Sequence, residues 1–262
     1  MPSRTVTLTT DFGTRDPYAG VMKGVIASLA PKANVIDITH EIEPFNVLEA
    51  AYAIAEAYRY FPPKTVHVIV VDPGVGSARR PLLVEAPGQF FIAPDNGVLS
   101  LIFASEQCRV RHITRQEYFL QPVSRTFHGR DIFAPCAARL AAGQTPASFG
   151  KRIHDPLQLA IARPARTARR VWTGGVLKVD RFGNLITNFP LEEFQDIQTQ
   201  PFELQVGFEK LTRLALNFAE GDPGQLLVMA GSSGYLEVAA NQASAAKMLG
   251  CGVGTPVELT LY

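Results

Sequence analysis

The first 71 residues of the chain alternate between short apolar runs and longer segments with helical periodicity. Strands are expected at 5–10, 34–39 and 65–71, and helices at 17–30 and 47–60. Strands that are joined by helical crossovers pair in parallel. The alternation therefore predicts an N-terminal α/β domain with a largely parallel sheet flanked by helices.

Both predicted helices are preceded by start signals. Asp16 stands before Pro17, a residue favoured in the first turn of a helix, and Asn46 stands three residues before Glu49, as in a capping box. These signals predict side-chain caps at Asp16 and Asn46.

Polar residues follow each of the three predicted strands. Ligands of open parallel sheets bind beyond the carboxyl ends of the strands. We therefore expect one rim to contain the side chains that occupy these loops, namely Asp11, Asp16, His40 and Asp72. The third loop, DPGVGSARR, contains glycines that would let backbone amides approach a ligand, although a turn without further function is an alternative.

After about residue 165 the pattern changes to short strand-like runs separated by Gly, Pro, Asp and Asn. This spacing is typical of a small all-β, barrel-like domain. The predicted domains are residues 1–164 and 171–262, with residues 165–170 as the linker between them. The loops at 179–188 and 231–244 are interpreted either as hairpin turns or as ligand-binding loops.

Composition and charge exclude several classes of protein. The 25 basic and 24 acidic residues give a net charge of +1, and no basic stripe interleaved with aromatic residues is present, so no nucleic-acid partner is expected. No run of 18 apolar residues and no signal peptide is found, which predicts a cytoplasmic protein without a membrane partner. The three cysteines form no CxxC pair, and no metal-binding, Walker or GxGxxG motif is present.

His128 is a further candidate because it precedes a predicted helix and titrates near neutral pH. A structural role for this histidine remains the alternative. From the residues alone the chemistry is undetermined.

Seven motifs occur in an order that resembles the S-adenosylmethionine (SAM) hydroxide adenosyltransferase family, which is related to bacterial fluorinases and chlorinases. These motifs are TTDFGTRDPYAG, IEPFNVLEAAY, VVDPGVG followed by arginine, FIAPDNGVLS, FHGRDIFAP, DRFGNLITN and GSSGYLEVA. The resemblance covers nearly the whole chain.

The resemblance implies a set of site residues. Asp72, Arg79 and His128 correspond to the group that handles the nucleophilic water, with the adjacent Arg80 as an alternative to Arg79. The implied substrate contacts are Asp11 to the ribose hydroxyls, Asn184 to adenine, Phe45 and Phe182 as apolar walls, and Asp16, Asp180, Ser232, Glu237 and Ala240 to the ribose or the methionine end.

Three departures from the halogenases favour water as the nucleophile. By resemblance, the halogenases have tyrosine in place of Asp72, serine in place of Gly129, and an inserted loop that is absent here between Ala86 and Phe90. Ser233 stands where the halogenases have arginine, which leaves recognition of the methionine carboxylate open.

The implied activity is hydrolysis of SAM to adenosine and L-methionine, with the R sulfonium epimer as one candidate substrate. The resemblance implies no metal and no cofactor, and a homotrimer whose active sites lie between subunits. The alternatives are a halide (chloride) adenosyltransferase, a non-catalytic nucleoside-binding protein and a metal-dependent hydrolase.

Overall fold

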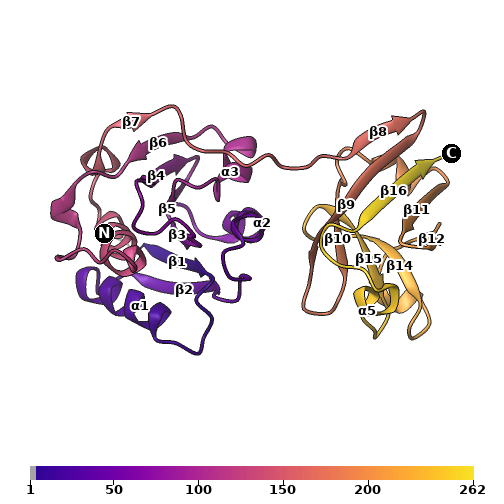
Figure 1. The fold of residues 1–262 in the computed structure, drawn as a ribbon, viewed down its shortest axis with the longest axis horizontal. Helices are drawn as coiled ribbons and strands as arrows, with labels where there is room; N and C mark the ends of the chain where they lie inside the picture. Colours follow the sequence, from indigo (N-terminus) through magenta and orange to yellow (C-terminus); the bar gives the residue numbers. More distant parts are fainter. Residues whose placement is uncertain (1–3) are drawn as a thin grey trace. The chain divides into compact units, whose positions relative to one another are not determined.

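The computed structural model describes residues 4–262, which form two compact units (Figure 1). The first unit ends at Leu159 and the second is Ala160–Tyr262. Residues 165–170, expected to be a linker, instead contain strand β8 (Ala165–Ala168), which pairs with β9 (Val171–Val179) in the second unit. This segment has the exposed, arginine-rich composition of a linker because its strand lies at the surface.

The first unit contains a seven-stranded sheet of order β2-β1-β3-β5-β4-β6-β7. Its strands are β1 (Thr5–Thr10), β2 (Asn34–Thr39), β3 (Val66–Val70), β4 (Pro81–Ala86), β5 (Gln89–Pro94), β6 (Arg109–His112) and β7 (Arg152–Ile153). Its helices are α1 (Tyr18–Leu29), α2 (Val47–Ala57), α3 (Ser100–Ser105) and α4 (Ala134–Ala141), with a π-helix at Gly129–Phe133 that leads into α4.

The predicted parallel pairing is confirmed for part of this sheet only. Strands β2, β1, β3 and β5 are parallel, whereas β5, β4, β6 and β7 are antiparallel. The reason is local: only residues 87–88 separate β4 from β5, and a connection this short makes a hairpin.

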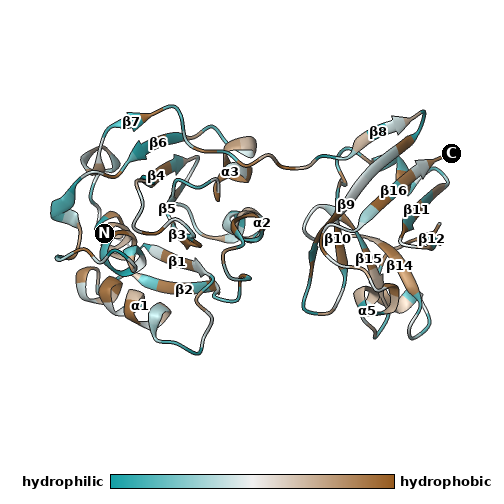
Figure 2. Cartoon of the chain, in the orientation of Figure 1, coloured by the Kyte–Doolittle hydropathy of each residue, from teal (hydrophilic) through white to brown (hydrophobic). Residues whose placement is uncertain are grey.

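Alternation along β3 divides the core of this unit into two layers. Val66, Val68 and Val70 pack with α1 and α4 on one face, whereas Ile69 faces the side covered by α2 and α3. On α1 the buried residues recur at helical spacing, and brown segments alternate with paler ones along this helix in Figure 2. The sheet is therefore covered by helices on both faces.

The predicted helix starts have different outcomes. Asn46 caps α2 by accepting a hydrogen bond from the Glu49 amide at 3.0 Å, as expected. Asp16 does not cap α1, whose N-cap is Pro17 without a side-chain hydrogen bond.

The second unit is a nine-stranded sheet of order β12-β11-β16-β9-β10-β15-β14-β13, with β8 attached to β9. Its remaining elements are β10 (Leu185–Pro190), β11 (Phe202–Val206), β12 (Glu209–Leu211), β13 (Leu214–Ala215), β14 (Leu226–Ala230), β15 (Tyr235–Ala240), helix α5 (Ala245–Leu249) and β16 (Pro256–Leu261). The sheet is curled around one apolar core, but the pairing does not close into a complete barrel.

In residues 4–262, no helix has the length and apolar character needed to cross a membrane.

Candidate active site

Three side chains from separate segments of the first unit form a continuous chain of contacts. Asp72 lies just beyond the carboxyl end of β3, Arg79 lies in the loop before β4, and His128 is the N-cap of the π-helix. Arg79 Nε donates to Asp72 Oδ1 at 2.9 Å, and Arg79 Nη2 donates to Asp72 Oδ2. The same Nη2 lies 2.7 Å from His128 Nδ1. Arg79 therefore links the carboxylate to the imidazole.

The Asp72–Arg79 pair is shielded from solvent. The two side chains are 5% and 8% exposed, and the Arg79 guanidinium lies 5.2 Å from the centre of the Phe133 ring. Two hydrogen bonds from one planar guanidinium fix the carboxylate orientation, and loss of either partner would leave a buried charge uncompensated.

The arginine contact defines the protonation of His128. A guanidinium offers only donors, so Nδ1 of His128 must accept, and the neutral ring carries its proton on Nε2. Burial and the neighbouring Arg79 charge lower the pKa of His128 below 6.5, outweighing the nearby carboxylates. The imidazole is therefore mainly neutral at neutral pH.

Gly76 lets the Asp72 loop pack closely against the segment before His128. Its φ is +78°, and a Cβ at this position would lie 2.2 Å from the backbone oxygen of Arg125. A side chain would force these two segments apart. The glycine thus has a packing role that also keeps Asp72 near His128.

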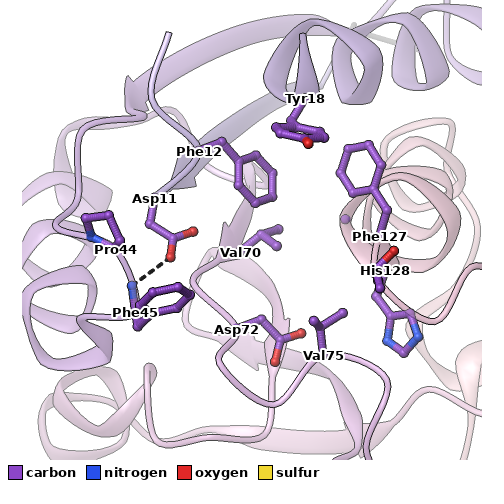
Figure 3. Close-up of a pocket in the computed structure, with 12 residues that line it drawn as sticks. Asp11, Phe12, Tyr18, Pro44, Phe45, Val70, Asp72, Val75, Phe127 and His128 are labelled. Atoms are coloured by element: carbon purple, nitrogen blue, oxygen red, sulfur yellow. Dashed lines mark hydrogen bonds between the residues drawn. The ribbon is translucent and has the colours of Figure 1, made fainter. Parts of the chain in front are cut away.

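Asp72 and His128 border a cavity of about 280 Å³. Its lining residues are Asp11, Phe12, Tyr18, Pro44, Phe45, Val70, Asp72, Val75, Thr126, Phe127, His128 and Gly129. The rings of Phe12, Tyr18 and Phe127 gather on one side, with Asp72 across from them (Figure 3). Their ring centres are 5.3–5.9 Å apart, so the cavity combines an aromatic wall with two carboxylates.

The carboxylate of Asp11 holds the backbone at Phe45. Asp11 Oδ2 accepts from the Phe45 amide at 2.9 Å (Figure 3). Phe45 has a φ of +69°, which is unusual for a residue other than glycine, and its side chain is 71% exposed. Strained backbone of this kind clusters at functional sites.

The remaining residues predicted to share the rim lie elsewhere. Asp16 is exposed and does not line the cavity. His40 is buried, with Nδ1 2.8 Å from Thr10 Oγ1 and Nε2 3.0 Å from Asp37 Oδ1. His40 therefore contacts the end of β1 instead of the cavity.

Arg80, the alternative to Arg79, contacts neither Asp72 nor His128. Its guanidinium donates to Asp95 and Asp155 instead. The two adjacent arginines thus have separate partners.

In the second unit, Asp180, Phe182 and Asn184 share the turn between β9 and β10. Asp180 Oδ1 accepts from the amides of Phe182 and Asn184, and Oδ2 accepts from Asn184 Nδ2 at 2.8 Å. This network presents the Phe182 ring, which is 77% exposed, at the tip of the turn.

The other predicted contacts belong to the turn between β14 and β15 and to β15 itself. Ser232 is exposed, Ala240 is buried, and Glu237 accepts a hydrogen bond from Ser233 Oγ at 3.3 Å.

Among the lining residues that the sequence did not predict are three aromatic ones, namely Phe12, Tyr18 and Phe127. All three stand within motifs that were singled out for their polar members, and Phe12 and Phe127 are adjacent in sequence to Asp11 and His128. Their proximity to candidate polar residues is the signal that could have identified them. In the part of the chain described by the structure, no group of three or more His, Cys, Asp or Glu side chains is arranged to hold a metal ion.

Two family models match the chain. The N-terminal domain of SAM hydroxide adenosyltransferase matches residues 6–150, and the C-terminal domain matches residues 174–258. The model of the N-terminal domain alone covers more than half of the chain.

Individual relatives agree with this assignment. The chain is 37% identical to the (R)-S-adenosyl-L-methionine hydrolase of Salinispora tropica, over 99% of this chain and 98% of that protein. It is 26% identical to a fluorinase of an Actinoplanes species, over 95% of each chain. A crystal structure of an uncharacterized conserved protein from Thermotoga maritima superposes with a TM-score of 0.92 at 38% identity, covering 98% of this chain and 99% of that one. The chain therefore belongs to the SAM hydroxide adenosyltransferase family.

Proposed function

We propose that this chain hydrolyses S-adenosyl-L-methionine to adenosine and L-methionine, with the R sulfonium epimer as the preferred substrate. The observation that carries the proposal is the Asp72–Arg79–His128 chain beside a largely apolar cavity. The relatives named as (R)-SAM hydrolases support the choice of substrate and epimer.

The reaction makes limited demands on the protein. A water oxygen attacks the 5′ carbon, the bond from that carbon to sulfur breaks, and its electron pair goes to sulfur. Methionine leaves as a neutral thioether, so no general acid is needed. The site must hold the water in line with the leaving sulfur and accept one proton.

Asp72 is the proton acceptor in this proposal. Nδ1 of His128 is occupied by Arg79 and Nε2 carries a proton, so the neutral imidazole donates to the water oxygen and does not take its proton. Each Asp72 oxygen accepts one bond from Arg79, and a carboxylate oxygen has a second lone pair for the water. Arg79 stabilises the negative charge of Asp72 until the proton arrives.

The apolar wall favours the same reaction. The negative charge of Asp72 and the positive charge of the sulfonium are both neutralised as the water gives up its proton and the carbon–sulfur bond breaks, so a cavity with few waters disfavours the reactants more than the transition state. Phe12, Phe45 and Phe127 line the cavity and exclude water around the nucleoside.

We further propose that the second unit completes the binding site in a homotrimer, between neighbouring subunits. Asn184 would contact adenine and Phe182 would stack on the nucleoside, while Asp11 holds the ribose. The exposed rings of Phe45 and Phe182 support this assembly, because large exposed aromatic side chains commonly mark interaction surfaces. Asp16, Asp180, Ser232, Glu237 and Ala240 remain proposed contacts to the ribose or the methionine end.

The proposal is tested by a product assay with each separated sulfonium epimer in chloride buffer. Chromatography should show adenosine and methionine, formed faster from the R epimer. Formation of 5′-chloroadenosine would instead identify a halide adenosyltransferase. Adenosine binding without turnover at any pH would identify a nucleoside-binding protein, and loss of turnover on chelation would identify a metal-dependent hydrolase.

A further inference from the structure

Arg80 and the motif FIAPDNGVLS have no part in the proposed chemistry, yet they form a network of their own. Asp95 is 3% exposed, and its Oδ2 accepts from Arg80 Nε at 2.7 Å. The Asp95 amide donates in turn to the Arg80 backbone oxygen at 2.8 Å. Ser100, at the start of α3, is also buried.

This network binds the last residues of the first unit, 155–159, through backbone groups that lie on one side of the segment. Arg80 Nη2 donates to the Asp155 carbonyl at 2.7 Å, the Leu157 amide donates to Asp95 Oδ1 at 2.8 Å, and the Leu159 amide donates to Ser100 Oγ at 2.7 Å. Alternate residues of an extended chain present their polar groups to the same side. Side chains therefore replace the neighbouring strand that would normally bind such an edge.

Gly97 makes the close approach of this segment possible. Its φ is +90°, and a Cβ there would lie 2.6 Å from Leu159 Cγ. Burial contributes little at Leu157, which is 58% exposed. Polar contacts are what hold the segment.

The second unit binds the chain again only a few residues later. Asn188 is buried in β10, and its Nδ2 donates to the Ala162 carbonyl at 3.1 Å. Only residues 160–161 lie between the last contact with the first unit and this contact with the second.

We propose that Arg80, Asp95 and Ser100, here named the exit clasp, are positioning residues that limit the length of the connector between the two units. The proposal rests on the proposed function, in which substrate is enclosed by groups from both units. With the clasp closed, the two connecting residues span at most about 7 Å; release of residues 155–159 would lengthen the connector to a span of about 24 Å. Within the proposed homotrimer, a longer flexible connector lowers the effective concentration of the second unit of one subunit at the first unit of its neighbour.

The clasp is tested with the double variant Ser100→Ala/Asp155→Ala. Ser100→Ala removes the acceptor for the Leu159 amide. Asp155→Ala removes one of the two carboxylate partners of Arg80 and leaves the buried Asp95 paired with the other groups that it binds. The matched control is Ser105→Ala/Glu117→Ala. Ser105 lies on the same helix and donates to carbonyls of that helix, and Glu117 is ion-paired and 76% exposed, as is Asp155.

Two readouts separate the clasp from the proposed function. Amide hydrogen exchange at Leu159, which loses its acceptor, should be at least about tenfold faster in the clasp variant than in the control. In the hydrolysis assay the KM for SAM should be about three- to tenfold higher than in the control, and kcat should differ by less than about twofold. The reason is that the variant weakens the enclosure of substrate but does not alter the groups of the chemical step.

Several results would overturn the proposal. Exchange equal to the control would show that the clasp does not hold the segment. Faster exchange with unchanged KM, or a fall in kcat alone, would show that the segment does not act through the connector. Absence of hydrolysis in the unmodified protein would instead refute the proposed function, while the exchange measurement would still report on the clasp.

Discussion

At the scale of single residues, Arg79 determines what its two neighbours can do. It supplies two donors to Asp72 and one to His128, so the carboxylate stays oriented and the imidazole keeps its proton on Nε2. A lysine could not make this planar, forked set of contacts. The division of roles in the proposed mechanism therefore depends on an arginine at this position.

The role of Asp72 as proton acceptor leads to a first prediction. Asp72→Asn keeps the size of the side chain but removes its ability to accept a proton, so kcat should fall by about 10²–10⁴. Adenosine affinity, measured by calorimetry, should change by less than about threefold, since the nucleoside contacts remain. Equal losses of turnover and affinity would show that Asp72 serves binding only.

The lowered pKa of His128 leads to a second prediction. Protonation would place a hydrogen on Nδ1 against the Arg79 guanidinium and break the contact between them. Because burial keeps the pKa of His128 below 6.5, kcat/KM should be constant above that pH and fall as the pH drops through the lowered value. In His128→Asn, whose amide oxygen can replace Nδ1 as acceptor without titrating, the acid limb should move to lower pH. An unchanged acid limb would assign it to another group.

At the scale of elements, β3 is a buried strand whose carboxyl end leads directly to Asp72 in the candidate site. His67, in its middle, has Nδ1 2.7 Å from Thr7 Oγ1 on β1 and stacks on Phe91 of β5 with ring centres 5.0 Å apart. Three neighbouring strands, β1, β3 and β5, are thus joined by a polar group that is fully buried.

This histidine leads to a third prediction, on stability. Burial lowers the pKa of His67 from 6.5 to about 4, despite the opposing effect of the nearby Gln89 side chain. The unfolded chain therefore binds a proton more readily, and the free energy of unfolding should decrease as the pH falls from 6.5 to 4, by up to about 3 kcal/mol from this group. Denaturant titrations should show a shallower decrease over this range for His67→Asn. Parallel pH profiles for the two proteins would exclude the assignment.

The elements also show what the sequence could and could not predict. Local signals identified β1, β2, β3 and the Asn46 cap correctly, because periodicity and capping depend on neighbouring residues. The antiparallel half of the first sheet was missed, because no helix separates β3 from β4 and because β4 and β5 form a hairpin, unlike the first three strands.

The candidate site, too, could be predicted from the sequence only in part. The rule for strand ends placed Asp11 and Asp72 at one cavity but also included Asp16 and His40, which do not line it. The choice between Arg79 and Arg80 needed the structure, because adjacent residues of an extended segment face opposite sides and His128 is 49 residues away from Arg79. Contacts over such separations have no local sequence signal.

At the scale of the whole molecule, the proposed homotrimer predicts that two defective chains can restore each other. Asp72→Asn impairs the first unit and Asn184→Ala the second. Suppose that each site combines the first unit of one subunit with the second unit of its neighbour. When the two variants are co-expressed in equal amounts and assemble at random, about one site in four then has both units intact. Turnover should then reach about a quarter of the wild-type value per site, and light scattering should give three times the mass of one chain. A site formed within a single chain would contain one defective unit in every copy, and the mixture would be no more active than its components.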